Sequence, residues 1–378
     1  MSIEAQIMII GVPTEIKNHE YRVGMVPSSV RELTIKGHVV YVQSDAGVGI
    51  GFTDQDYIDA GASILATAAE VFAKSDMIVK VKEPQAVERA MLRHDQILFT
   101  YLHLAPDLPQ TEELITSGAV CIAYETVTDD RGGLPLLAPM SEVAGRMSIQ
   151  AGARALEKSL GGRGMLLGGV PGVEPAKVVI IGGGMVGTNA AQMAVGMGAD
   201  VVVLDRSIDA LRRLNVQFGS AVKAIYSTAD AIERHVLEAD LVIGGVLVPG
   251  AAAPKLITRD MVKRMKPGSA IVDVAIDQGG CVETSHATTH QDPTYIVDDV
   301  VHYCVANMPG AVARTSTFAL NNATLPYIIK LANQGYKQAL LNDKHLLNGL
   351  NVMHGKVVCK EVAEALNLEF TEPKSLLA

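Results

Sequence analysis

The segment KVVIIGGGMVGTNAAQMAVGMGADVVVLD, residues 177–205, has the most specific chemical spacing in the chain. Gly182, Gly184 and Gly187 form the pattern GxGxxG directly after a β-branched run and at the start of a helical one. There the first glycine permits a tight turn, the second lets the backbone approach a pyrophosphate, and the third lets helix and strand pack closely. Asp205 ends the next strand, where a carboxylate accepts hydrogen bonds from ribose hydroxyls and repels a 2′-phosphate. The segment predicts a dinucleotide site that favours NAD, whereas an ordinary glycine turn would need neither the flanking elements nor the acid.

His103 stands near the end of the apolar run ILFTYLHLA, residues 97–105. A lone histidine at a strand end is most often a hydrogen-bonded packing residue. Its imidazole, with an ordinary pKa of about 6.5, is also well suited to give and take protons near neutral pH. The run alone does not choose between these two roles.

Cationic residues follow early strands of the chain. In IVKVKEP, Lys80 and Lys82 are expected on one side of a strand, because side chains alternate with a period of two. Two cations on one face indicate an anion site, although charges that keep an edge strand soluble would look the same. Arg22 lies in the polar loop TEIKNHEYRVGMVP, where its planar fork can bind a carboxylate through two hydrogen bonds or simply be solvated.

The segment AIVDVAIDQGG, residues 270–280, runs from a hydrophobic strand into a carboxylate and two glycines. In doubly wound sheets, ligands bind outside the carboxyl ends of the strands, and Asp277 is expected there. A turn-forming aspartate before Gly-Gly is the alternative. Asp273, earlier in the run, is expected inside the sheet or at its edge and is assigned no chemistry.

The elements that position these residues follow from the periodicity. At 378 residues, the chain exceeds the roughly 250 to 300 at which a single core stops growing, so two domains are expected. Apolar runs alternate with amphipathic stretches up to about residue 135 and again from 177 to about 305, which predicts mostly parallel sheets with helices on both faces. Between them, residues 140–160 are predicted to form one long helix that ends at Gly161 and Gly162. The remaining residues look helical and are expected to fold back onto the first domain.

Composition excludes several classes of function. The chain is 48% hydrophobic and carries a net charge of −9 with no run of Lys or Arg, which argues against nucleic acid or an anionic membrane as a partner. The N-terminal MSIEAQIMII lacks the basic start and long apolar core of an export signal. Residues 178–199 contain no charge, but their glycines after a β-branched run indicate a strand and a helix rather than a membrane span.

Four cysteines without a CxxC pair predict reduced thiols, with neither a zinc site nor a disulfide framework: Cys121, Cys281, Cys304 and Cys359.

The motifs recur in order along nearly the whole chain, and together they resemble the alanine dehydrogenase family. The nucleotide-binding subunits of proton-translocating transhydrogenases share its fold and several of its glycines. The resemblance rests on GVPTEIKNHEYRVGMVP, KVKEP, ILFTYLHLA, YETV, APMSEVAGRMS, LLGGVPGVEPAKVVIIGGG, VLVPGAAAPKLI, VDVAIDQGGC and YCVANMPGAVARTST.

The resemblance implies an α/β fold of two doubly wound Rossmann-like domains, with an NAD domain inserted into a substrate domain built from both termini. The substrate domain is expected to comprise residues 1–135 and a helical part, 307–378, and the NAD domain residues 136–306. The resemblance further implies a homohexamer that acts in L-alanine catabolism, and the expected reduced thiols fit a cytoplasmic location. Its expected activity is the reversible NAD-dependent oxidative deamination of L-alanine to pyruvate and ammonium, without nucleic acid, membrane or resident metal.

Roles at matching positions also follow from the resemblance. Arg22 matches the arginine that binds the substrate carboxylate, and Lys82 matches the lysine that contacts the substrate. His103 matches the catalytic acid–base histidine, and Asp277 matches the aspartate that partners it across the cleft between domains. The cofactor-binding positions that the resemblance implies are Ser141, Gly182, Gly184, Gly187, Asp205, Asn307 and Met308.

The expected reaction explains these residue types. Oxidation of L-alanine moves a hydride from the α-carbon to nicotinamide, and water attacks the resulting iminium to give a carbinolamine that collapses to pyruvate and ammonia. His103 can exchange the protons that these steps require, and Lys82 can stabilise the oxygen that gains negative charge in the reverse direction. The Asp277 carboxylate can position water and balance the iminium charge, while Arg22 aligns the substrate.

A transhydrogenase-type subunit and a non-catalytic NADH-binding sensor are the alternatives. The first would need a second nucleotide domain and would form no NADH from alanine. The second would bind a partner protein or DNA, against which the acidic charge and the lack of a recognisable DNA-binding module argue. Neither needs the arginine, lysine, histidine and aspartate together. Arg206, beside Asp205, is the one neighbour that makes the preference for NAD over NADP less strict.

Overall fold

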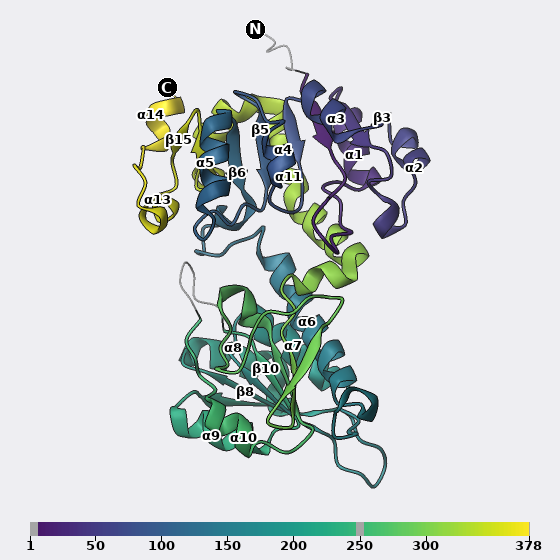
Figure 1. The fold of residues 1–378 in the computed structure, drawn as a ribbon, viewed down its shortest axis with the longest axis vertical. Coiled ribbons are helices and arrows are strands. Elements are labelled where there is room, and N and C mark those ends of the chain that lie inside the picture. Colours follow the sequence, from purple (N-terminus) through teal and green to yellow (C-terminus); the bar gives the residue numbers. More distant parts are fainter. Residues whose placement is uncertain (1–6, 247–252, 378) are drawn as a thin grey trace. The chain divides into compact units, whose positions relative to one another are not determined.

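The structure is a computed structural model that describes residues 7–246 and 253–377 (Figure 1). The N-terminal residues 1–6 and the part 247–252 of the motif VLVPGAAAPKLI lie outside the described residues. The chain divides into two compact units, one formed by Met1–Pro139 with Val312–Ala378 and the other by Met140–Ala311. The first unit is therefore built from both ends of the chain.

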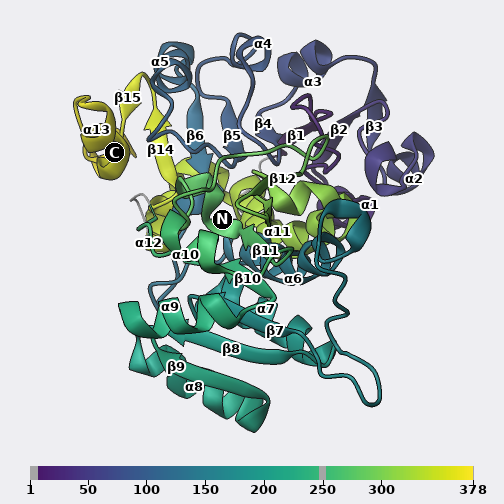
Figure 2. The ribbon, with the colours of Figure 1, turned by 60° about the horizontal axis from the view of Figure 1, so that its bottom comes forward.

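The first unit contains an eight-stranded sheet in the order β15-β14-β6-β5-β4-β1-β2-β3. Its strands are β1 (Ile9–Val12), β2 (Val39–Gln43), β3 (Ser63–Leu65), β4 (Met77–Val79), β5 (Ile97–Thr100), β6 (Val120–Ala123), β14 (Leu350–Met353) and β15 (Lys356–Val357). Its helices are α1 (Pro27–Thr34), α2 (Asp54–Asp59), α3 (Ala68–Lys74), α4 (Ala86–Arg89), α5 (Leu108–Ser117), α11 (Ala313–Asn342), α12 (Lys344–Leu347), α13 (Lys360–Leu366) and α14 (Pro373–Leu377). The strands from β1 to β6 are parallel to one another. Figure 2 shows them side by side.

The C-terminal part of the first unit is less helical than the sequence predicts. Leu350 of β14 pairs with Ile122 of β6 in antiparallel orientation, and Val352 of β14 pairs with Val357 of β15. The prediction of helices alone here was wrong because the two strands are four and two residues long, too short for a clear alternation. The predicted helical runs form α11 and α13, and α11 is broken at Gly335, whose φ is 71°.

The second unit contains a seven-stranded sheet in the order β12-β13-β11-β10-β7-β8-β9. Its strands are β7 (Lys177–Ile181), β8 (Asp200–Asp205), β9 (Val222–Tyr226), β10 (Leu241–Gly244), β11 (Ala270–Asp273), β12 (Thr294–Val297) and β13 (Val300–Tyr303). Its helices are α6 (Ala138–Ala155), which begins at the last residues of the first unit, α7 (Met185–Gly196), α8 (Ile208–Phe218), α9 (Ala229–Glu238) and α10 (Arg259–Arg264). Among the described strands of this sheet, only the edge strand β12 is antiparallel to its neighbour. The predicted class, two doubly wound α/β sheets with one inserted between two parts of the other, is confirmed.

Each sheet has a core of β-branched and leucine side chains. The central strands β5, β6, β10 and β11 are buried along their whole length, as strands covered by helices on both faces must be. The uncharged stretch 178–199 forms most of β7 and all of α7. Within the described residues, none of the helices combines the length and the apolar character needed to cross a membrane.

The long helix predicted over residues 140–160 ends earlier than expected. Helix α6 stops at Ala155, and a separate 3₁₀ turn, η3 (Lys158–Leu160), follows. Gly161 then ends η3 with a φ of 85°, a left-handed conformation that glycine adopts without strain. The glycine thus ends a helical turn as predicted, but not the long helix itself.

Candidate active site

Arg22 is buried, with only 2% of its surface exposed. Its Nε donates to Oε1 of Glu20 at 2.6 Å, and its Nη2 donates to Oε2 of the same carboxylate at 2.5 Å. Burial alone would lower the pKa of Arg22, but the hydrogen bonds and charge of Glu20 outweigh this effect and raise it. The interpretation of Arg22 as a solvated loop residue is therefore wrong, because the guanidinium is a fixed, buried cation.

The loop that carries Arg22 is held by α11 and by close contact with β4. Asn321 of α11 accepts a hydrogen bond from the Val26 amide and donates one to the Gly24 carbonyl, both at 2.8 Å. A Cβ atom on Gly24 would lie 2.3 Å from the carbonyl oxygen of Val79, the last residue of β4. Only glycine lets the loop approach this closely, so this contact places the Arg22 loop beside the carboxyl end of β4.

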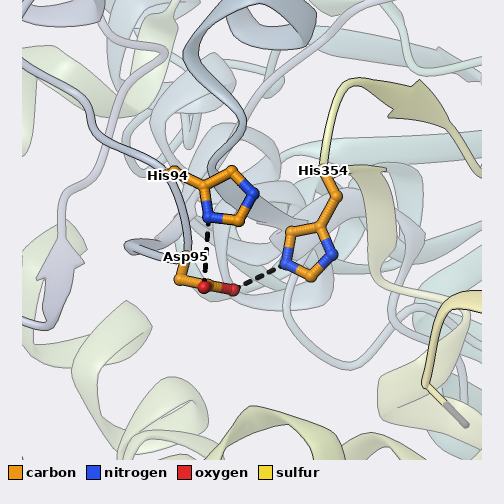
Figure 3. Close-up of side chains that lie close together, drawn as sticks. All are labelled: His94, Asp95 and His354. Carbon is orange, nitrogen blue, oxygen red and sulfur yellow. Dashed lines mark hydrogen bonds and ion pairs between the residues drawn. The ribbon is translucent and has the colours of Figure 1, made fainter.

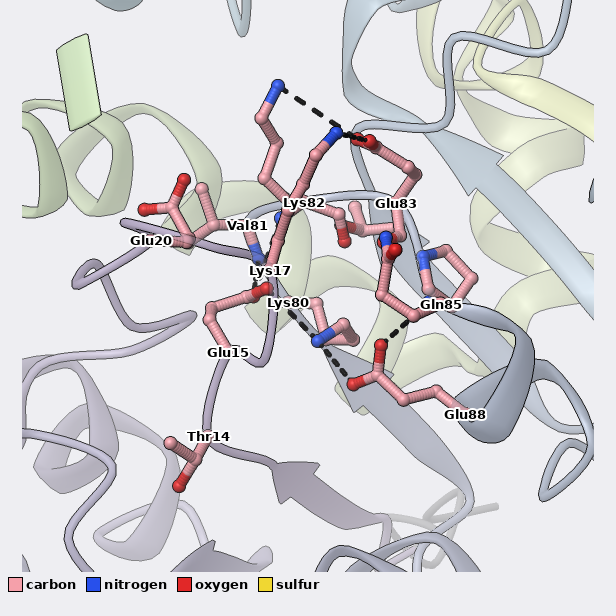
Figure 4. A network of polar contacts seen from close by, with 12 residues as sticks. Thr14, Glu15, Lys17, Glu20, Lys80, Val81, Lys82, Glu83, Gln85 and Glu88 are labelled. Carbon is pink, nitrogen blue, oxygen red and sulfur yellow. Dashed lines mark hydrogen bonds and ion pairs between the residues drawn. The ribbon is translucent and has the colours of Figure 1, made fainter. Parts of the chain in front are cut away.

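Lys80 and Lys82 do not share one face, because the strand ends at Val79 (Figure 4). Lys80 is completely buried, and its Nζ lies 3.1 Å from Oε2 of Glu15 and 2.7 Å from Oε1 of Glu88. Lys82 points elsewhere and remains partly exposed, with Nζ 3.9 Å from Oε2 of Glu83. The expectation of a two-lysine anion site is wrong for Lys80. An edge-strand role is also wrong, since β4 lies between β5 and β1.

The carboxylate of Glu15 fixes the backbone that leads to Lys82. Oε1 of Glu15 accepts hydrogen bonds from the amides of Val81 at 2.7 Å and Lys82 at 3.4 Å. Burial alone would lower the pKa of Lys80, but the charges of Glu15 and Glu88 raise it, so Lys80 stays protonated and holds Glu15 in place. This network explains how a lysine just past a short strand acquires a fixed position.

His103 lies three residues beyond the end of β5 and is exposed, with 46% of its side chain accessible. Its φ is 51°, a left-handed conformation that is uncommon for a residue with a side chain. Its amide donates to Oε1 of Glu125 at 2.5 Å, and its Nδ1 lies 3.8 Å from the same oxygen. The ring stacks on Tyr101, with centroids 5.7 Å apart and planes 5° from parallel. His103 is therefore not a core packing residue; it is an accessible imidazole held beside a carboxylate.

Tyr101 stacks on His103 and also interacts with the charge of Arg22. Its hydroxyl donates to the Leu136 carbonyl at 2.6 Å, and burial raises its pKa although the charge of Arg22 lowers it. Thr100, its neighbour, donates to the Lys82 carbonyl at 3.0 Å. The first unit thus gathers Arg22, Lys82 and His103 around the carboxyl ends of β4 and β5.

The glycine signature of the second unit fits a dinucleotide phosphate. Gly182 has a φ of 100°, and a Cβ atom on Gly187 would lie 1.8 Å from the Gly182 carbonyl oxygen, so helix and strand meet as closely as predicted. Gly184 caps the N-terminus of α7 without a side-chain hydrogen bond. Apart from Gly184 itself, its chain neighbours and nearby helix backbone, no atom of the described residues lies within 4 Å of the place where a Gly184 Cβ would stand. The first-turn amides of α7 are therefore open to an anion, as a pyrophosphate requires.

Asp205 stands at the end of β8, beside this turn. Its Oδ2 accepts a hydrogen bond from the Gly183 amide and its Oδ1 one from the Ser207 amide, both at 2.6 Å. These bonds hold the carboxylate where the ribose of a dinucleotide is expected. Arg206 is exposed, so its side chain does not share the fixed position of Asp205.

Asp277 lies in a 3₁₀ helix, η5 (Val274–Gln278), directly after β11, as its predicted place outside a strand end requires. It is exposed, and within the described part of the chain no hydrogen bond or ion pair involves its carboxylate. The turn itself is made by Gly279 and Gly280, with φ of 87° and 77°. Asp273, by contrast, is fully buried and accepts hydrogen bonds from two backbone amides. Its predicted place inside the sheet is confirmed.

The remaining cofactor positions lie at element ends of the second unit. Ser141 is half-buried in the first turn of α6. Asn307 has a φ of 61°, and its carbonyl oxygen accepts a hydrogen bond from the Gly310 amide at 2.9 Å. Met308 begins the 3₁₀ helix η6 (Met308–Val312) and is packed into the core, 3% exposed. Met308 can therefore offer a cofactor mainly its backbone.

Three carboxylates that position the predicted residues were missed in the sequence. Glu15 and Glu20 lie in the same loop as Arg22, and Glu125 lies in the motif YETV. They could have been recognised as acidic residues close to the ends of apolar strands, because a carboxylate that is buried there needs a cationic or amide partner. Each serves the backbone or side chain of a predicted site residue.

Comparisons with known proteins show the family of the chain. The family models "Alanine dehydrogenase/PNT, N-terminal domain" and "Alanine dehydrogenase/PNT, C-terminal domain" match residues 11–144 and 148–360. An alanine dehydrogenase of Halomonas elongata is 61% identical over 370 residues, 98% of this chain and 100% of that protein. A solved L-alanine dehydrogenase structure has a TM-score of 0.93 at 56% identity, covering 95% of this chain and 99% of its own. A transhydrogenase structure from Sinorhizobium meliloti has a TM-score of 0.81 at 26% identity, covering 93% and 100%. The chain belongs to the alanine dehydrogenase/PNT family.

Proposed function

We propose that this chain is an enzyme that catalyses the reversible NAD-dependent oxidative deamination of L-alanine to pyruvate and ammonium. The observation that carries the proposal is the 61% identity with an alanine dehydrogenase over 98% of the chain. The transhydrogenase structure is less similar, at 26% identity, which favours the dehydrogenase activity over the transhydrogenase alternative. A bound NAD supplies the acceptor for the hydride that leaves the α-carbon of alanine.

Arg22 is proposed to bind the substrate carboxylate. The guanidinium is buried and already fixed by Glu20, so little side-chain entropy remains to be lost when a second carboxylate binds. Lys82 is proposed to place its Nζ near the substrate oxygen, because it is the partly exposed lysine of this strand end. In the direction of alanine synthesis, this ammonium stabilises negative charge that develops on the carbonyl oxygen of pyruvate.

His103 is proposed as the acid–base group. Its Nδ1 faces Glu125, so Nε2 is assigned the exchange of protons with substrate and water. Glu125 accepts a hydrogen bond from the His103 amide and so holds the backbone that carries the ring. Asp277 is proposed to position the attacking water and to balance the cationic iminium, because its carboxylate is exposed directly after β11.

The NAD site is proposed at the carboxyl ends of β7 and β8. The amides that follow Gly182 and Gly184 hold the pyrophosphate, Gly187 permits the close packing of α7, and Asp205 binds the ribose. Ser141, Asn307 and Met308 are proposed as further contacts of the cofactor.

A cytoplasmic homohexamer is proposed from the family resemblance. The four cysteines are buried free thiols, as suits a reducing compartment. Sedimentation equilibrium of the purified chain measures the assembly directly. A mass of six chains supports the hexamer, and a stable monomer or dimer contradicts it.

The experiment that tests the activity follows the NADH absorbance band in purified protein supplied with NAD and L-alanine. The reverse direction uses NADH, or NADPH for comparison, with pyruvate and ammonium. Alanine-dependent NADH formation is the expected result. Tight NADH binding without turnover in either direction would contradict the proposal and favour the sensor or transhydrogenase-type alternative.

A further inference from the structure

His94, Asp95 and His354 form a cluster at the edge of the first unit (Figure 3). His94 and Asp95 lie in the turn before β5, and His354 lies in the turn between β14 and β15. This edge is at the amino end of β5, whereas His103 follows its carboxyl end. The cluster is therefore separate from the proposed alanine site.

The two imidazoles direct ring nitrogens toward one carboxylate. Nδ1 of His94 lies 3.1 Å from Oδ2 of Asp95, and Nε2 of His354 lies 2.6 Å from Oδ1. The three potential donor atoms lie within 4.8 Å of one another. With metal–ligand bonds of about 2.0 to 2.2 Å, two ligands of a tetrahedral ion are about 3.4 Å apart. The distance from His94 to Asp95 is close to this spacing, and the distance from His354 to Asp95 is shorter by less than 1 Å. The His94 side chain is 67% exposed, so its ring has room to turn toward an ion.

The turn that carries His354 does not itself require a histidine. Met353 pairs with Lys356, so His354 and Gly355 are the two central residues of a tight hairpin, with φ of 49° and 78°. Hairpins with positive φ at both central positions prefer asparagine or aspartate before the glycine. A histidine whose Nε2 reaches Asp95 across 259 positions of sequence therefore needs another explanation.

A second layer of contacts orients the cluster. Tyr336 of α11 donates from its hydroxyl to Oδ1 of Asp95 at 3.0 Å. The rings of His94 and His354 stack, with centroids 4.8 Å apart and planes 11° from parallel. Carboxylates and histidines that bind metals are commonly oriented by such outer contacts. The side chains remain 67%, 57% and 24% exposed, so an ion and its remaining water ligand can enter from solvent.

We propose that His94, Asp95 and His354 bind a divalent first-row transition ion, with Zn²⁺ as the type, in a three-ligand site completed by water. Two imidazoles and one carboxylate are a ligand set that Zn²⁺, Ni²⁺ and Cu²⁺ accept, whereas Mg²⁺ and Ca²⁺ prefer oxygen alone. The ion takes the place of the protons that the ring nitrogens now share with Asp95. It joins the hairpin β14–β15 to the turn before β5 and thereby clamps the C-terminal strands onto the sheet.

The test is calorimetric titration of Zn²⁺ into the untagged, metal-stripped full chain, repeated with the variants His94→Ala and His354→Ala. The wild-type chain is expected to bind one Zn²⁺ per chain at this site and to melt at a higher temperature when Zn²⁺ is present. Each variant is expected to bind at least about tenfold more weakly and to lose the thermal shift. The four thiols compete little, because all of them are buried.

His345→Ala is the matched control: His345 pairs with Asp130 at 2.9 Å but, among the described residues, belongs to no group of three potential metal ligands. This variant should bind Zn²⁺ as the wild type does. His94→Ala is expected to fold normally, because the His94 side chain is mostly exposed. Weaker Zn²⁺ binding by this variant therefore reports the loss of a ligand and not unfolding. Equal Zn²⁺ binding by the wild type and both site variants, absence of binding by the wild type, or loss of binding in His345→Ala would overturn the proposal.

Discussion

Arg22 and Glu20 form a buried ion pair in which both oxygens of the carboxylate accept hydrogen bonds from one guanidinium, at 2.6 and 2.5 Å. Removing one partner of a buried pair costs about 3 to 5 kcal/mol, because the remaining charge stays in a poorly solvated place. Glu20→Ala should lower the free energy of unfolding in urea by this amount. Glu113→Ala is the control, since Glu113 pairs with Arg89 at the surface and should cost at most about 1 kcal/mol. Equal losses in the two variants would contradict the account of Arg22 as a buried, preorganised cation.

Lys82 and Lys17 both contact Glu83, but only Lys82 is assigned to the substrate. Lys82→Ala should reduce kcat/KM for pyruvate by about a hundredfold, as loss of one charge-stabilising donor typically does. Lys17→Ala should leave it nearly unchanged. Steady-state kinetics of pyruvate amination measures both variants. A similar loss in the two would mean that the charge around Glu83, and not a specific lysine, supports the reaction.

Asp205 should determine the choice between NAD and NADP. Replacing it with asparagine keeps the shape of the side chain and removes the charge that repels a 2′-phosphate, so the preference for NAD should fall by roughly tenfold or more. The measurement is kcat/KM for each cofactor at saturating alanine. Asp209→Asn removes a charge from an exposed residue of α8 and should not alter the ratio. An unchanged ratio in Asp205→Asn would assign the preference to other residues.

The carboxyl group of Asp343 should make the free energy of unfolding depend on pH. Burial raises the pKa of its carboxyl, but hydrogen bonds from Lys330 and from the amides of Leu346 and His345 hold it below the ordinary value. A lowered folded pKa means that the carboxylate stabilises the fold above the ordinary value of about 3.9, and that this stabilisation is lost as the pH falls through the folded value.

The variant Asp343→Asn keeps a good helix cap and removes the charge. The wild type should therefore be more stable by up to about 1 kcal/mol between neutral pH and pH 5, with the difference vanishing in stronger acid. Urea unfolding at a series of pH values gives this difference. If the difference in the free energy of unfolding between the wild type and Asp343→Asn grew as the pH fell, the lowered pKa of Asp343 would be contradicted.

The sequence predicts those parts of the fold that repeat a pattern. The strand, glycine turn and helix around Gly182, Gly184 and Gly187 were predictable because each glycine answers a local backbone requirement. The parallel sheets were predictable because strands buried on both faces read as continuous apolar runs. Strands β14 and β15 were not, because their short segments gain their structure from pairing with β6 and with each other.

The site residues were predictable in type but not in surroundings. Lys80 and Lys82 appeared equivalent in the sequence. They differ in the structure because β4 ends at Val79, so that Lys80 is buried and Lys82 stays accessible. Glu20 gave no periodic signal, because its role depends on a tertiary pairing within a loop. The run ILFTYLHLA alone could not separate His103 from a core histidine, and the resemblance assigned it the catalytic role. Its exposure and its place beside Glu125 now exclude core packing.

His103 is proposed to exchange protons during alanine oxidation, and the kinetics of His103→Ala are the first measurement to make of this role. Loss of a general acid–base group lowers turnover by roughly 10²- to 10⁴-fold. Such a loss of alanine-dependent NADH formation is expected in His103→Ala, while NADH fluorescence titration should give a nearly unchanged dissociation constant. His345→Ala, a histidine also paired with a carboxylate, should keep full activity. Turnover at the wild-type rate in His103→Ala would rule out this proton exchange and leave His103 without a part in the chemistry.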